Sequence, residues 1–273
     1  MTYKTILVHA EPGAAGEARL RLTIELARLF NARVLGLAAE GSMPMAMTGV
    51  PEADAVILET SREQVAGDLD QAERRFRSVV GSAIPDSDCI RAWDFPAVEL
   101  SRHAGAADLI VCSRQGRSAR ASQSASGADV ALSSGAPVIF PGSAGAPFRG
   151  ERVVVAWKPT RETRRAVSDS LPFLMHASRT TLVAVDGDGQ DVDRTALSEV
   201  AARLARHGVD VRTQVVPRGK ARVAEVLESV AAREGADLIV MGAFGHSRLQ
   251  EWVLGGATED MLAACDRHVL MSH

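Results

Sequence analysis

The sequence predicts an α/β protein made of two tandem copies of one unit, each with a parallel sheet covered by helices on both faces. Short β-branched runs alternate with amphipathic helical stretches along the chain. This alternation is typical of parallel sheets, because a right-handed crossover through a helix joins each strand to the next. The same motifs recur at a fixed offset, which indicates a duplication. With 273 residues, of which 46% are hydrophobic, the chain is long enough for two ordinary domains.

Matching segments place the two copies along the chain. Residues 107–116 (ADLIVCSRQG) match residues 236–245 (ADLIVMGAFG) at an offset of 129, and the first strand runs of the two copies correspond as well. Between the copies lies a stretch rich in Pro, Gly and Ser, which is typical of a linker. The repeat therefore predicts an N-terminal domain over residues 1–141, a linker over residues 142–150 and a C-terminal domain over residues 151–273.

The second copy shows the order of strands and helices most clearly. Thr160 is predicted to cap the helix after the first strand, and Pro172 to end or kink that helix. The segment 41–51 of the first copy has no counterpart, and it is either a surface insertion or a flap over a site. In the second copy we expect strands near residues 152–157, 180–186, 209–216, 237–241 and 268–271, and helices near residues 161–176, 192–207, 220–234 and 257–265.

Glycines follow the fourth predicted strand of the second copy in a pattern that favours phosphate binding. Gly242 and Gly245 come directly after the strand, and Gly255 follows after nine intervening residues. Glycine lets backbone N–H groups approach a ligand closely, because no Cβ is in the way. The run Gly256–Ala257–Thr258 then begins a predicted helix, whose free N–H groups attract an anion. The alternative is that the glycines only form turns and that Thr258 only caps the helix.

Two other strands end at the same edge of the predicted sheet. In an open parallel sheet, ligands bind beyond the carboxyl ends of the strands, where the strand order reverses. Lys158 follows the first strand and is either a cation for a phosphate or a solvated loop charge; both alternatives are open. The predicted nucleotide-binding residues are Ala156, Trp157, Lys158, Val185, Met241, Gly242, Gly245, Gly255, Gly256, Ala257 and Thr258.

The sequence predicts a binding site rather than a reaction. Its seven histidines and three cysteines show no metal-ligand spacing, and no nucleophile can be paired with a general base. We therefore expect no catalytic residue, no metal ligand and at most a weak ATPase. A net charge of −3, spread over both halves, argues against nucleic acid or a membrane as partner. Since there is no leader segment and no apolar run of about 20 residues, the expected location is the cytoplasm.

The glycine spacing resembles that of the universal stress protein family in its tandem two-domain form. Gly242-x2-Gly245-x9-Gly255 is similar to the ATP-binding pattern of this family. The resemblance implies a Rossmann-like, adenine nucleotide alpha hydrolase-like sheet of five parallel strands in the order 3-2-1-4-5. It also implies ATP as ligand, with or without Mg²⁺, adenine against Val185, and ribose and phosphates on the glycine loop. The two domains are expected to pair within the chain, and a further homodimer is left open.

The chain departs from the family pattern at three places. Gly256 stands where the family has Ser or Thr, which removes a hydroxyl. The acidic residue expected after the first strand is Lys158 in the second copy, although Glu11 holds this place in the first copy. In the first copy, Ser113 and Ser126 replace two of the motif glycines. We therefore expect the first copy not to bind ATP and to serve as a structural partner.

These patterns leave two functions open. The first is a nucleotide-binding module for stress response or signalling that uses the site of the C-terminal domain. The second is a scaffold or interaction protein that binds no nucleotide, which the altered residues Lys158 and Gly256 would explain. Titration with ATP distinguishes the two functions.

Overall fold

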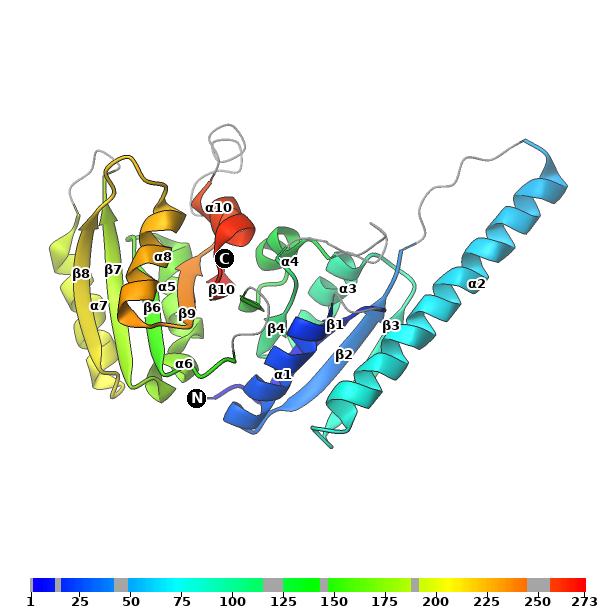
Figure 1. Cartoon of the computed structure of the whole chain (residues 1–273), viewed down its shortest axis with the longest axis horizontal. Helices are drawn as coiled ribbons and strands as arrows, with labels where there is room; N and C mark the ends of the chain where they lie inside the picture. The colour runs from blue at the N-terminus through cyan, green and yellow to red at the C-terminus, as the bar shows by residue number, and fades with distance from the viewer. Residues whose placement is uncertain are drawn as a thin grey trace. The chain divides into compact units, whose positions relative to one another are not determined.

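The chain forms two compact units, which are described separately (Figure 1). The computed structural model describes residues 2–12, 16–41, 49–114, 125–142, 147–187, 192–244 and 256–273. The N-terminal unit consists of residues 4–130, and the C-terminal unit consists of residues 131–273 together with the first three residues. The limits of these two compact units differ from the predicted domain limits of 1–141 and 151–273. The predicted limits describe a repeat in the sequence, and they stay a prediction.

The N-terminal unit is a parallel sheet in the order β3-β2-β1-β4. Helix α2 has an apolar stripe, including Val65 and Leu69, that packs against the sheet, but its first half extends past the sheet (Figure 1). The elements are β1 (Thr5–Ala10), α1 (Glu17–Phe30), β2 (Arg33–Ala39), α2 (Pro51–Phe76), the π-helix η2 (Arg77–Gly81), β3 (Ser87–Ala92), α3 (Pro96–His103), the short helix η3 (Ala104–Ala106), β4 (Leu109–Val111) and α4 (Gly127–Ser133), whose last residues fall in the C-terminal unit.

The C-terminal unit contains a parallel sheet in the order β8-β7-β6-β9-β10. In chain order this is 3-2-1-4-5, so the predicted fold class and strand order are confirmed here. The elements are β5 (Val138–Phe140), β6 (Arg152–Ala156), α5 (Arg161–Asp169), α6 (Leu171–His176), β7 (Arg179–Asp186), α7 (Arg194–Arg206), β8 (Val211–Pro217), α8 (Val223–Glu234), β9 (Leu238–Gly242), α10 (Ala257–Ala264) and β10 (His268–Ser272).

One strand of this unit is not parallel, which the sequence analysis did not predict. Strand β5, which the repeat assigns to the first copy, pairs antiparallel with β10, and Ile139 lies opposite Leu270. The backbone groups on the outer edge of β10 thereby find partners, as an unpaired edge strand would not. The sheet is therefore mixed rather than purely parallel.

The local signals in the second copy act as predicted. Thr160 caps α5, because its hydroxyl accepts a hydrogen bond from the backbone N–H of Thr163 at 3.3 Å. The predicted single helix over residues 161–176 is two helices, α5 and α6, which meet at Ser170. Pro172 lies in the first turn of α6, where its missing N–H costs nothing, so it ends one helix and starts the next.

Helices cover both faces of the C-terminal sheet. Figure 1 shows α8 in front of this sheet, whereas α6 and α7 lie behind it. The chain runs outward from β6 through β7 to β8 and then returns to β9 on the other side of β6. Because both kinds of connection are right-handed, their helices lie on opposite faces of the sheet. The strand order therefore reverses between β6 and β9. Their carboxyl ends flank the crevice in which such sheets bind ligands.

The first and fourth strands have the same register in the two units. Ile6 pairs with Leu109 on β1 and β4, as Val153 pairs with Leu238 on β6 and β9. The strand centres are fully buried and apolar on both faces, as helices on both sides of a sheet require. The shared register gives each residue at the end of β1 or β4 a defined counterpart at the end of β6 or β9.

Candidate functional site

The strand ends at the switch point of the C-terminal unit bring several predicted residues together. Ala156 ends β6, and the backbone N–H of the buried Trp157 donates to the carbonyl of Val183 on β7 at 2.7 Å. On the other side of β6, the buried Met241 leads to Gly242, which ends β9. The half-buried Val185 lies near the end of β7 at the same edge. Sequence reasoning therefore placed these residues at the correct edge of the sheet.

A hydrogen bond joins the residues on either side of segment 245–255. The backbone N–H of Phe244 donates to Thr258 Oγ1 at 3.1 Å. Phe244 has a φ of 53°, a left-handed conformation that side chains rarely adopt, and Thr258 is 2% exposed. The hydroxyl of Thr258 is therefore used as an acceptor within the protein. Gly245 and Gly255 lie outside the described residues.

Helix α10 begins beside this hydrogen bond. Gly256 is its N-cap residue and supplies no side-chain acceptor to the first turn. The first N–H groups of a helix have no partner inside the helix, so those that follow Gly256 are available to an anion. The predicted residues Gly256, Ala257 and Thr258 thus lie at a helix start, as expected.

Gly242 has a packing role that the sequence did not reveal. A Cβ built on Gly242 would lie 2.6 Å from the backbone N of Thr163 and 2.7 Å from the backbone C of Glu162. Both atoms belong to the first turn of α5, so the helix start can approach the end of β9 only if residue 242 has no side chain. This contact explains the glycine without any ligand, alongside its predicted part in phosphate binding.

A carboxylate that the sequence analysis missed lies at this helix start. Glu162 is 6% exposed and accepts a hydrogen bond from Arg161 Nε at 2.6 Å. Burial alone would raise the pKa of this carboxyl, but hydrogen bonds from its own backbone N–H, Arg161 and Thr160 outweigh burial and lower the pKa below its ordinary value. Glu162 is therefore a fixed negative charge. Its only sequence signal is its position two residues after the capping Thr160.

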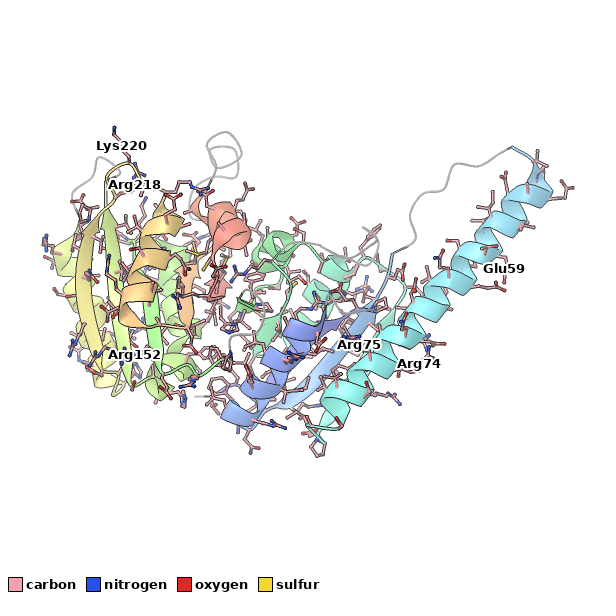
Figure 2. All side chains as sticks on the ribbon, in the orientation of Figure 1. Glu59, Arg74, Arg75, Arg152, Arg218 and Lys220 are labelled. Atoms are coloured by element: carbon pink, nitrogen blue, oxygen red, sulfur yellow. The ribbon has the colours of Figure 1, made fainter. Side chains whose placement is uncertain are left out.

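Basic side chains lie on the loops at the same edge of the sheet. Lys158 is exposed on the loop after β6, which agrees with either alternative considered for it. Figure 2 shows Arg218 and Lys220 on the loop after β8, whereas Arg152 lies at the opposite end of the sheet. The backbone N–H of Arg218 donates to the carbonyl of Asp186 at 2.6 Å, which ties this loop to the end of β7. The carboxyl edge thus carries positive charge beyond that of the predicted Lys158.

The corresponding edge of the N-terminal unit is filled by buried charged side chains. Arg19 Nη2 lies 2.7 Å from Glu11 Oε1, and Arg19 Nη1 donates to the hydroxyl of Ser113. His9 is fully buried beside them, and burial together with the charge of Arg19 lowers its pKa well below the ordinary value. Burial also raises the pKa of the neighbouring Cys112 thiol to about 11, so this cysteine is a protonated core residue.

Within the described ranges, no group of three or more His, Cys, Asp or Glu side chains is placed to hold a metal ion. In the same part of the chain, no helix combines the length and the apolar character that crossing a membrane requires.

The fold is that of an open α/β protein whose strand order reverses between β6 and β9. Residues 174–273 match the sequence model of the universal stress protein family. This match in the C-terminal part of the chain agrees with the resemblance of the glycine spacing to that family. A search of curated protein sequences gave no significant match.

Solved structures share the fold over nearly the whole chain. A universal stress protein from Archaeoglobus fulgidus has a TM-score of 0.69 and 15% sequence identity, and the match covers 98% of this chain and 95% of that protein. A functionally unknown protein from Pseudomonas aeruginosa PAO1 has a TM-score of 0.58 and 14% identity, with coverage of 99% and 92%. At these identities the likeness concerns the fold alone.

Proposed function

We propose that the chain binds an adenine nucleotide, with ATP as the first candidate, at the carboxyl edge of the C-terminal unit. The hydrogen bond from Phe244 to Thr258 carries this proposal. It brings the end of β9 and the first N–H groups of α10 to one place, and these are the groups that cradle phosphates in α/β proteins. Val185 would contact the adenine, and Lys158 would lie toward the phosphates.

Unpaired buried polar atoms support a ligand at this edge. Trp157 Nε1 and Ser272 Oγ are buried and have no hydrogen-bond partner among the described residues. Trp157 directly follows β6, and Ser272 lies opposite Gly242 on β10. Buried polar groups nearly always have a partner, so a bound molecule or water at the strand ends would complete both.

The proposal is one of binding and not of catalysis. No described side chain at this edge forms a nucleophile–base pair, and the buried carboxylate of Glu162 is held by Arg161. A nucleotide-dependent change in partner choice, in the cytoplasm, is the corresponding role for a stress-response module. Mg²⁺ would then be bound by the phosphates rather than by protein side chains. Pairing of the two repeats within one chain belongs to this proposal.

Position 256 offers a test that separates folding from binding. Asp and Asn are both good N-cap residues of similar size, so Gly256→Asp and Gly256→Asn should both preserve or strengthen α10. Only the Asp variant places a negative charge beside the phosphates. Calorimetric titration with MgATP should give about one nucleotide per chain for the wild type and for Gly256→Asn. For Gly256→Asp the affinity should fall at least about tenfold, which corresponds to about 1.4 kcal/mol.

Two results would contradict the proposal, and each has its own meaning. Equal affinities in the two variants would remove the phosphates from the start of α10. No binding by the wild type at millimolar ATP would reject the proposal and favour a scaffold that binds no nucleotide.

A further inference from the structure

The N-terminal unit places a buried cation at the point where the C-terminal unit has its candidate site. Arg19 on α1 is ion-paired with Glu11, which follows β1, and hydrogen-bonded to Ser113, which follows β4. The side chains of Arg19 and Glu11 are only 2% and 4% exposed. One guanidinium therefore connects the two strand ends that flank the switch point of this unit.

These positions correspond to site residues of the C-terminal unit. The shared register of the β1–β4 and β6–β9 pairs makes Glu11 the counterpart of Lys158 and Ser113 the counterpart of Gly242. Gly16 and Thr160 are the N-cap residues of α1 and α5, so Arg19 and Thr163 are both the third residue of their helix. The trio Glu11, Arg19 and Ser113 thus replaces the trio Lys158, Thr163 and Gly242.

The two trios fill the same place in different ways. In the C-terminal unit, the bare backbone of Gly242 meets the backbone of Thr163. In the N-terminal unit, Ser113 carries a side chain, and the guanidinium of Arg19 reaches across to bind it. A Cβ on Gly16 would lie 3.1 Å from Arg19 Nη2 and 3.3 Å from Glu11 Cγ, so the start of α1 packs directly onto the ion pair. The side chains of Glu11, Arg19 and Ser113 are thus in contact at this point.

We propose that the guanidinium of Arg19 occupies the place in the N-terminal unit that corresponds to the nucleotide site of the C-terminal unit. The N-terminal unit therefore excludes nucleotides, and each chain binds one nucleotide. A phosphate that entered would have to displace the guanidinium and would leave the Glu11 carboxylate buried against an anion, which is strongly unfavourable. This inference rests on the proposed function of the C-terminal site, but its test also works where that proposal fails.

The test transplants the C-terminal trio into the N-terminal unit. The triple variant Glu11→Lys/Arg19→Thr/Ser113→Gly carries the three residues that the C-terminal unit has at these positions. Calorimetry with MgATP should show about two nucleotides per chain instead of one. When Gly256→Asp is added to weaken the C-terminal site, about one tight site should remain. The matched control is Arg21→Ser, which removes an exposed arginine of the same helix that pairs with Glu17, and it should leave the stoichiometry at one.

The outcomes separate the two proposals. A folded triple variant that gains no nucleotide, even when Ser126→Gly is added to restore the other motif glycine, overturns the role of Arg19, whatever the wild type binds. A wild type that binds none, together with a triple variant that binds one, rejects the proposed function but supports the role of Arg19. If the triple variant does not fold, the double variant Glu11→Gln/Arg19→Met, which removes both charges of the buried pair, decides, because a folded protein of this kind that still binds no additional nucleotide would overturn exclusion by Arg19.

Discussion

Phe244 and Thr258 are joined by a backbone-to-hydroxyl hydrogen bond of 3.1 Å that links the end of β9 to the first turn of α10. Thr258 is almost fully buried, and Phe244 has the left-handed φ of 53°. The bond therefore holds a strained residue beside a helix start. This pairing gives the C-terminal edge a defined shape before any ligand is bound.

Removal of the Thr258 hydroxyl should weaken both this contact and nucleotide binding. In Thr258→Val the N–H of Phe244 loses its acceptor, which should cost about 1–3 kcal/mol of unfolding free energy. Thr258→Ser keeps the hydroxyl and should lose less than half as much. Urea unfolding followed by titration with MgATP measures both effects. Equal stability of the two variants would show that the hydrogen bond contributes nothing.

Addition of one methyl group at Gly242 should be costly. In Gly242→Ala the new Cβ meets backbone atoms of Glu162 and Thr163 at 2.7 and 2.6 Å, and backbone cannot rotate away. Overpacking of this kind costs about 1–3 kcal/mol, so the melting temperature should fall. Gly67→Ala is the matched control, because nothing lies within 4 Å of the position on α2. That helical change should be neutral or should stabilise by about 0.5–1 kcal/mol. A Gly242→Ala protein as stable as the wild type would contradict the close approach.

Acid should destabilise the protein through His9. Burial, with the charge of Arg19, lowers the pKa of His9 well below its ordinary value of 6.5, so the folded protein keeps the ring neutral while the unfolded chain takes up a proton. Stability should therefore fall as the pH drops below about 6.5, by at most about 1.4 kcal/mol per pH unit from this residue.

The variant His9→Leu isolates this contribution. Its urea midpoint should fall less than that of the wild type between pH 7.5 and pH 5, because leucine cannot bind a proton. His207→Gln, which replaces an exposed histidine, should keep the wild-type pH dependence. Parallel curves for wild type and His9→Leu would show that His9 titrates normally.

Lys158 should contribute to the affinity for phosphates and not to that for adenosine. Its side chain is exposed, so Lys158→Ala should weaken MgATP binding modestly, by about three- to tenfold. The affinity for adenosine, which carries no phosphate, should not change. Lys4→Ala, an exposed lysine before β1, serves as control. Equal losses for ATP and adenosine would place Lys158 away from the phosphates and leave it a solvated loop charge.

The sequence was most informative where local signals agree with the fold. Alternation of strands and helices, the Thr160 cap and Pro172 together gave the order of elements in the C-terminal unit. The antiparallel partner of β10 could not be predicted, because β5 is a short apolar run with no signal for its direction or neighbour. Pairing between segments far apart in the sequence depends on the assembled sheet.

The sequence predicted which residues lie at the carboxyl edge of the C-terminal sheet, but it did not predict the buried charged side chains. The spacing of Gly242 and Thr258 pointed to the correct edge, since strand ends and helix starts leave clear patterns. Glu162 and Arg19 were missed because an ionisable residue in the first turns of a helix is normally solvent-exposed. Their burial arises from contacts with β9 and β4, which only the packed structure reveals.

The pairing of β5 with β10 has a consequence for the timing of assembly. Ile139 cannot meet Leu270 until the ribosome has completed the chain as far as β10, because β10 follows all the other strands. Until then the edge of β5 lacks this neighbour, and contacts between such distant segments form slowly. Strand β5 therefore emerges from the ribosome with one edge unpaired, and molecular chaperones can act on this edge until β10 has been made.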